Sequence, residues 1–216
     1  FNHGGYIDPK KINQSLLDNE NIKIHLRHEF KNFEIGSSNV TLRIDDNNQC
    51  DYDYLVLAHG SGLINFSNDL SLSKGQLVAA KISNSIKMPI NSSGYILPAK
   101  DGLNWIGASY DHQFKNLDVD EDKLKKMIAF QEDQYGVKNN SQQYDSRAQI
   151  RTVSKNKLPI VGKYKQNENI IMLGGFGSRG FCYGPILGDH VASIIDENPS
   201  PLEKNIATSL LPKNFK

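Results

Sequence analysis

The stretch GGFGSRGFCYGPILGDHVASII, residues 174–195, decides how the fold is interpreted. A short apolar run, residues 170–173, precedes the glycines, and an apolar helix pattern follows them. A strand, a tight glycine turn and a helix N-terminus form an anion site, because free backbone N–H groups and the helix dipole point at the bound group. A dinucleotide-binding fold has its phosphate-binding turn near its start, whereas this turn lies near the C-terminus. The rest of the sequence must therefore show what the loop binds.

Composition excludes several classes of protein. The 216 residues are 38% hydrophobic and 23% charged, with a net charge of +1, so the chain has no general electrostatic preference for nucleic acid or membranes. Two cysteines, Cys50 and Cys182, are too few for a zinc-ligand set or a disulfide framework. We therefore expect a cytoplasmic protein without a metal site. The chain begins FNHGGYIDP without a methionine, and we interpret it as a fragment of a longer protein.

The local patterns predict mixed α and β structure. Asp8 and Pro9 are suited to the start of a helix, and the apolar residues that follow fall on one face of it. Alternating apolar residues predict strands over 22–30 and 39–45, and the run YLVLA, 54–58, predicts a strand covered on both faces. Further strands are predicted within 75–83, 94–110 and 150–173, and an amphipathic helix over 120–135 that ends at Gly136.

The strand YLVLA ends in a second glycine turn, HGSG, residues 59–62. Either glycine turn is a weak signal by itself. Two such turns at the carboxyl ends of strands are a stronger one, because they can flank a single elongated anionic ligand at one edge of a sheet.

Six segments, in this order, resemble the D-amino-acid-oxidase type of FAD-dependent oxidoreductase. They are GGYIDP, YLVLAHGSG, KGQL, GYILPAKDGLNWIGASYD, RTVSKNKLPIVG and GGFGSRGFCYGPILG. IGASYD, GSRGF and the closing SLLPKNF make the resemblance closest to the MnmC branch, the bifunctional tRNA-modifying proteins of this family. The family's N-terminal βαβ unit, whose glycine motif binds the FAD pyrophosphate, has no counterpart in these residues.

The resemblance implies an α+β chain derived from an α/β parent. Both ends would form part of a Rossmann-like FAD-binding domain, and a mixed or antiparallel β-sheet substrate domain would be inserted between them. We predict FAD-domain segments at 1–66 and 147–216 and a substrate domain at 67–146. FAD is the implied cofactor of the intact parent. This chain by itself is expected to be inactive, and the resemblance leaves open whether it binds flavin.

The resemblance also assigns roles to single residues. Arg151 matches the arginine that holds the substrate carboxylate, and a guanidinium group fits a carboxylate bidentately. Arg179 would stabilise charge at the flavin or contact RNA phosphate; an ordinary solvated arginine is the alternative. The implied cofactor-binding residues are Ala58, His59, Gly60, Gly177, Ser178, Gly180 and Phe181. Tyr95 and Tyr110 are candidates for the substrate pocket, although packing in the core would explain either one.

The implied reaction is removal of a carboxymethyl group from carboxymethylaminomethyl-uridine in tRNA, by hydride transfer to flavin and hydrolysis of the imine. Two alternatives remain open: an oxidase of glycine, sarcosine or a D-amino acid, and a non-catalytic substrate-domain fragment without flavin. The expected partner is accordingly tRNA or a small amine, and we expect no association with a membrane. Without the first strands, the parallel sheet would have an exposed edge, and we expect a homo-oligomer to form through it.

Overall fold

The computed structural model describes residues 5–28, 32–36, 39–43, 49–82, 86–136, 138 and 145–214. The chain forms two compact units, each built from two segments. Unit 1 comprises Phe1–Ile24 and Lys74–Gln149, and unit 2 comprises His25–Ser73 and Ile150–Lys216. This division describes packing within the chain, so the domain boundaries at 66/67 and 146/147 stay a prediction about the parent fold.

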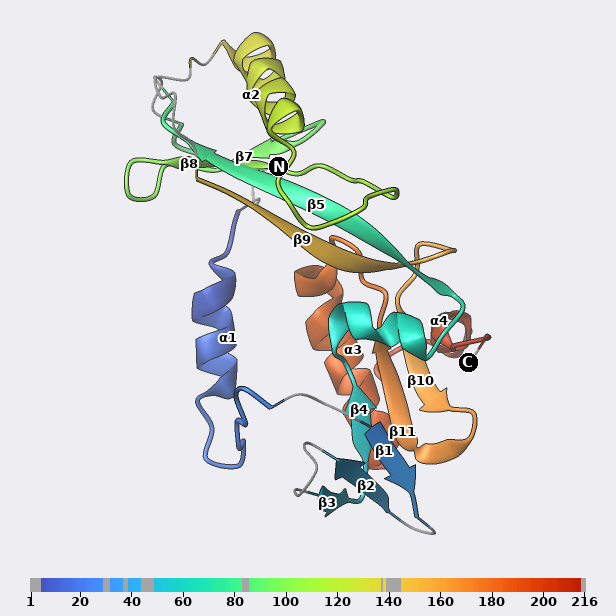
Figure 1. Ribbon diagram of the computed structural model, residues 1–216. Coiled ribbons are helices and arrows are strands. Elements are labelled where there is room, and N and C mark those ends of the chain that lie inside the picture. Colours follow the sequence, from blue (N-terminus) through green and yellow to red (C-terminus); the bar gives the residue numbers. More distant parts are fainter. Residues whose placement is uncertain are drawn as a thin grey trace. The chain divides into compact units, whose positions relative to one another are not determined.

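Unit 2 is built on a mixed sheet in the order β10-β11-β4 (Figure 1). Strand β11 pairs antiparallel with β10 and parallel with β4. A second, antiparallel sheet has the order β1-β2-β3. The elements of this unit are β1 (Asn32–Ile35), β2 (Val40–Arg43), β3 (Gln49–Tyr52), β4 (Leu55–Leu57), the 3-10 helix η1 (Gly60–Asn65), β10 (Ile160–Tyr164), β11 (Asn167–Gly174), α3 (Gly180–Ile195) and α4 (Lys204–Leu210).

Both faces of β11 are covered, which explains its continuous apolar run. Ile170 and Met172 pack on one face with Leu57 and with Val40 of β2. On the other face, Ile171 packs against the side chains of α3 and α4. Strand β4 is covered less completely, since Leu57 is buried and Val56 is 37% exposed.

Unit 1 contains most of a five-stranded sheet in the order β6-β7-β8-β5-β9. Helix α2 lies over one face of the sheet, where Leu124 and Ile128 pack against Val78 and Ile106. The unit holds α1 (Pro9–Leu17), β6 (Ile90–Asn91), β7 (Tyr95–Ile96), β8 (Asn104–Gly107) and α2 (Glu121–Tyr135). Strands β5 (Leu70–Ala80) and β9 (Asp145–Ser154) continue from one unit into the other.

The helix ends follow the sequence signals. The Asp8 side chain accepts a hydrogen bond from the Lys10 amide at 3.1 Å, and Pro9 opens α1. Asp120 caps α2 through the Lys123 amide at 3.1 Å, and Gly136 ends that helix in the left-handed region. The predictions of both helices are therefore confirmed.

One local prediction is wrong. Residues 22–28 form no strand, and Arg27 in this segment has a φ of 62°, which extended backbone does not adopt. The segment Lys74–Gln76, part of KGQL, lies inside strand β5. There the buried Lys74 side chain donates to the Asp118 carbonyl oxygen. Within the described residues, no helix is both long and apolar enough to cross a membrane.

Candidate functional site

The glycine loop after β11 owes its conformation to the lack of side chains. Gly175 and Gly177 have φ angles of +71° and +58°, in the left-handed region that favours glycine. A Cβ atom on Gly174 would lie 2.2 Å from Leu63 Cδ1, so this glycine allows η1 to pack directly on the end of β11. The predicted order of strand, glycine turn and helix is confirmed.

Helix α3 begins immediately after this loop without a side-chain cap. The first amides of a helix have no acceptor within the helix, and the dipole adds partial positive charge at this end. The first turn, GFCY at 180–183, contains no acidic residue that would neutralise this charge. The N-terminus of α3 is therefore suited to an anionic or electron-rich group.

The second glycine turn lies at the same edge of the sheet. Ile170, Ile171 and Met172 pair in parallel with Leu55, Val56 and Leu57, so both strands end on one side. Residues 58–60 follow β4, and Gly60 has a φ of +65°. The expectation that the two turns meet at one carboxyl edge is borne out by this register.

The His59 ring packs within its own turn. It meets Phe66 edge-on, with 5.6 Å between ring centroids, and a Cβ on Gly62 would lie 2.3 Å from its Cδ2. Desolvation lowers the pKa of His59, and a hydrogen bond with the Gly62 backbone acts in the opposite direction. The imidazole is consequently held neutral at pH 7 and occupies a packing position beside the edge.

Arg151 is connected to the glycine loop through the backbone of its own strand. The Gly177 amide donates to the carbonyl oxygen of Thr152 at 2.9 Å, and Val153 and Phe176 form an isolated antiparallel bridge. Both contacts lie within unit 2. Arg151 therefore directly precedes Thr152, the strand residue to which the loop is hydrogen-bonded. The Arg151 side chain is half-buried.

Arg179 has partners within its own unit. One guanidinium nitrogen donates to the Lys157 carbonyl oxygen, and another donates to the Tyr183 hydroxyl at 3.2 Å. The guanidinium also lies 5.1 Å from the Tyr183 ring centroid. Arg179 is exposed but engaged with its own chain, which differs from a freely solvated arginine.

The predicted tyrosines lie in unit 1 in different surroundings. Tyr95 is in strand β7 and covers Gly107, where an added Cβ would lie 2.6 Å from the tyrosine ring. Tyr110 follows β8, lies outside any strand and is 57% exposed. The placement of Tyr110 in a strand was therefore wrong.

The edge of unit 2 gathers most of the predicted residues: Ala58, His59, Gly60, Arg151, Gly177, Ser178, Arg179, Gly180 and Phe181. Sequence reasoning missed Arg147, whose guanidinium lies 4.9 Å from the Trp105 ring centroid. Arg147 and Arg151 are an even number of residues apart in β9 and so share one face of the strand. This spacing was the signal available in the sequence. No group of three or more potential metal ligands clusters among the residues described.

The spacing G-x-G-x-x-G, at Gly175, Gly177 and Gly180, was also missed as a pattern. It follows a strand and opens a helix, as a dinucleotide-binding turn does. However, α3 is followed by α4 and not by a parallel strand, so the βαβ context of a pyrophosphate site is not formed here.

Residues 1–194 match the family model described as DAO, FAD dependent oxidoreductase. The chain belongs to this family. The DAO assignment agrees with the predicted fold: an α+β chain with the mixed sheet of unit 2 and a five-stranded sheet that lies mostly in unit 1.

Curated relatives in sequence include the tRNA 5-methylaminomethyl-2-thiouridine biosynthesis bifunctional protein MnmC. The protein of that name from Campylobacter jejuni subsp. jejuni serotype O:2 is 27% identical over 241 residues, which cover 98% of this chain and 39% of the relative. MnmC of Caulobacter sp. strain K31 is 29% identical over 177 residues, 79% of this chain and 29% of the relative. This DAO-family chain thus spans well under half of the length of these relatives.

Solved structures with this fold include glycine oxidase from Geobacillus kaustophilus. The two structures match with a TM-score of 0.67 at 16% sequence identity. The match covers 81% of this chain and 50% of the glycine oxidase chain. Glycine oxidase from Bacillus cereus has a TM-score of 0.64 at 22% identity, with 82% and 52% covered. At these identities the likeness concerns the DAO fold alone.

The edge of unit 2 fits one part of the FAD that the DAO family implies. The α3 N-terminus has no side-chain cap, and its first turn holds no acidic residue. These features suit the electron-rich flavin ring. A βαβ site for the pyrophosphate is not formed by the described residues.

Proposed function

We propose that this chain forms the flavin-ring edge and the substrate unit of an FAD-dependent amine oxidase that removes the carboxymethyl group from carboxymethylaminomethyl-uridine in tRNA. The bond from the Gly177 amide to the Thr152 carbonyl oxygen, 2.9 Å, is the observation that carries the proposal. It ties the strand that bears Arg151 to the loop that opens α3. The MnmC relatives supply the tRNA part of the proposal.

The residues of this chain bind and orient the substrate. Arg151 holds the carboxylate of the –NH–CH2–COO⁻ group with two parallel hydrogen bonds, which fixes the methylene carbon. FAD, when bound, supplies the acceptor for the hydride that leaves this carbon. The amides of Gly180 and Phe181, which open α3, stabilise the negative charge that develops beside them. Water then splits the imine into the aminomethyl-uridine and glyoxylate.

A second candidate is oxidation of a small free amine such as glycine, sarcosine or a D-amino acid. The solved structures of glycine oxidases and of an iminodiacetate oxidase favour it, since they share the fold. Arg151 would have the same role, because these substrates also carry a carboxylate. The two candidates differ in whether RNA is part of the substrate.

The first test is the visible absorption spectrum of the purified chain after addition of excess FAD and desalting. A retained flavin band supports binding at this edge. Anaerobic bleaching of that band is then compared for glycine, sarcosine and tRNA carrying carboxymethylaminomethyl-uridine. Bleaching by the modified tRNA alone supports the first candidate, and bleaching by free amines supports the second. A colourless chain favours the third possibility, a non-catalytic substrate unit.

Replacing Arg151 tests the role of the carboxylate clamp. In a flavin-loaded enzyme, Arg151→Lys keeps the charge but loses the bidentate geometry, and charged hydrogen bonds contribute about 1.5–3 kcal/mol. We therefore expect kcat/KM to fall roughly tenfold to a hundredfold, mainly through KM. Arg43→Lys is the control, because Arg43 is an exposed residue of the same unit paired with Glu34. Equal kcat/KM values for the Arg151→Lys and control proteins would show that Arg151 does not bind the substrate carboxylate.

A further inference from the structure

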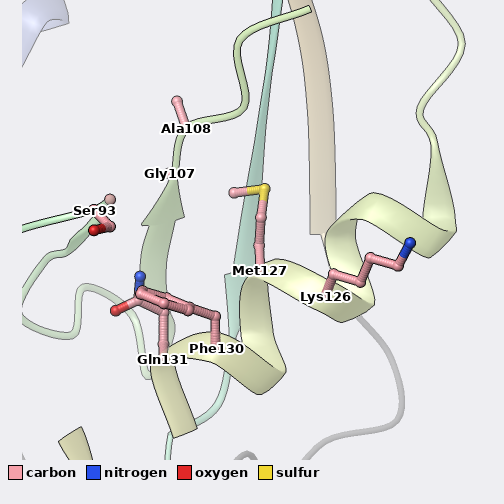
Figure 2. A pocket seen from close by; sticks show the side chains of 8 residues that line it. Ser93, Gly107, Ala108, Lys126, Met127, Phe130 and Gln131 are labelled. Atoms are coloured by element: carbon pink, nitrogen blue, oxygen red, sulfur yellow. The ribbon is translucent and has the colours of Figure 1, made fainter. Parts of the chain in front are cut away.

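A cavity in unit 1 is lined by none of the residues predicted for the flavin site. It has a volume of about 220 Å³ and lies between helix α2, the end of β8 and the turn before β7 (Figure 2). Its lining residues are Ser93, Gly94, Gly107, Ala108, Lys126, Met127, Phe130 and Gln131. Pockets for drug-sized ligands begin at about 300 Å³, so this cavity suits a ligand smaller than most drugs.

Gln131 gives the cavity an unsatisfied polar group. The residue is 3% exposed, and its Oε1 has no hydrogen-bond partner among the residues described. A buried amide oxygen without a donor is unfavourable unless a ligand supplies one. The amide end lies below Gly107 in the wall of the cavity (Figure 2). A ligand that donates a hydrogen bond to this oxygen would explain why it has no partner within the protein.

The space around this amide is preserved by glycine. A Cβ on Gly94 would lie 3.0 Å from Gln131 Nε2 and 2.9 Å from the Gly107 carbonyl oxygen. The Tyr135 hydroxyl of α2 also donates to Ser92 Oγ at 2.5 Å, which fastens the turn to the helix. The two walls of the cavity are thus held in place before any ligand arrives.

Apolar and cationic groups complete the lining. Met127 and Phe130 flank Gln131 on α2, and Phe130 is 39% exposed. Lys126 extends away from Gln131, at the other end of the lining (Figure 2). Within the described part of the chain, the Lys126 ammonium group forms no ion pair. An elongated ligand with a planar polar ring at one end and an anion at the other matches this order of groups.

We propose that this cavity binds a nucleoside monophosphate, with the base against Gln131 and the phosphate at Lys126. A primary amide has a donor and an acceptor side by side, the pattern that pairs with the edge of a nucleobase. Phe130 and Met127 offer apolar surface to the face of the base. The phosphate neutralises the Lys126 charge. This site is independent of the flavin edge and of the proposed oxidation.

The test uses adenosine and uridine monophosphates as probes, with ribose 5-phosphate and adenosine as partial ligands. Binding is measured by calorimetric titration and by saturation-transfer NMR of the base protons. Gln131→Met keeps the side-chain shape and removes the amide, and Lys126→Gln removes the charge. We expect at least a tenfold loss of nucleotide affinity in each. Lys125→Gln is the matched control, because Lys125 is exposed on the same helix and does not line the cavity.

The free Gln131→Met protein is expected to melt at the same or a higher temperature, because the substitution removes a buried unpaired oxygen. Lost affinity in that variant therefore reflects the missing amide and not misfolding. A short single-stranded RNA that competes with the nucleotide and depends on Gln131 identifies RNA as the natural source of the base, and failure to compete identifies a free nucleotide. Nucleotide binding that is absent, that is unchanged by Gln131→Met, or that is matched by ribose 5-phosphate would overturn the proposal.

Discussion

At the scale of single residues, the glycine loop shows how close packing positions the candidate site. Gly174 lies under the fully buried Leu63, and a Cβ would come within 2.2 Å of Leu63 Cδ1. Gly188, in the interior of α3, has open space around the same position. Replacement by alanine is therefore expected to destabilise the folded chain at Gly174 and to stabilise it at Gly188.

We expect Gly174→Ala to lower the free energy of unfolding by about 1–3 kcal/mol, the usual cost of forcing extra atoms into a packed core. Gly188→Ala should raise it by roughly 0.5–1 kcal/mol, since alanine is the better helix former. Denaturant titration of both variants measures the two changes. A neutral Gly174→Ala would mean that η1 is not held against the end of β11.

At the scale of elements, one carboxylate accepts three hydrogen bonds from the C-terminal segment. Asp69 Oδ2 accepts hydrogen bonds from the Lys213 and Asn214 amides at 3.0 Å each, and Oδ1 accepts one from the Asn214 side chain. Desolvation raises the pKa of Asp69, but the hydrogen bonds from Asn214 and Lys213 outweigh it, so the pKa is lowered from its usual value. The charged form of Asp69 is therefore favoured in the folded chain.

A carboxylate with a lowered pKa stabilises the folded chain above its unfolded pKa of about 3.8, and this contribution is lost as the pH falls through the folded value. Asp69→Asn should loosen residues 213–214 already at pH 7, measured as faster hydrogen exchange of the Lys213 and Asn214 amides. It should also reduce the loss of stability between pH 5 and pH 3. Asp189→Asn, on the exposed side of α3, is the control and should change neither.

The elements that sequence predicted well have local causes. Both caps of α2 and the start of α1 depend on side chains within four residues, so their patterns were sufficient. The segment 22–28 alternates like a strand, but alternation forms a strand only where a neighbouring strand supplies hydrogen-bond partners. The proximity of Arg151 to the glycine loop, and the polar cavity at Gln131, depend on long-range packing that no local pattern encodes.

At the scale of the whole molecule, the parallel edge of unit 2 is the surface through which we expect copies of the chain to associate. Strand β4 is the terminal strand in the order β10-β11-β4 of the described residues, and Val56 on it is 37% exposed. An edge strand offers N–H and C=O groups to another chain, and exposed apolar side chains strengthen such pairing. We therefore expect copies of this chain to associate through β4.

Val56→Lys should weaken this association, because a charged side chain on an edge strand disfavours pairing with a second copy. Light scattering over a range of protein concentrations measures the change as a shift toward the mass of one chain, 24.2 kDa. Leu117→Lys is the control, since Leu117 is 46% exposed but does not lie in a sheet edge. Association that persists in Val56→Lys and is lost in Leu117→Lys would place the contact in unit 1. A wild-type chain that stays monomeric at high concentration would show that β4 is covered without a partner, and the edge would then carry no role in assembly.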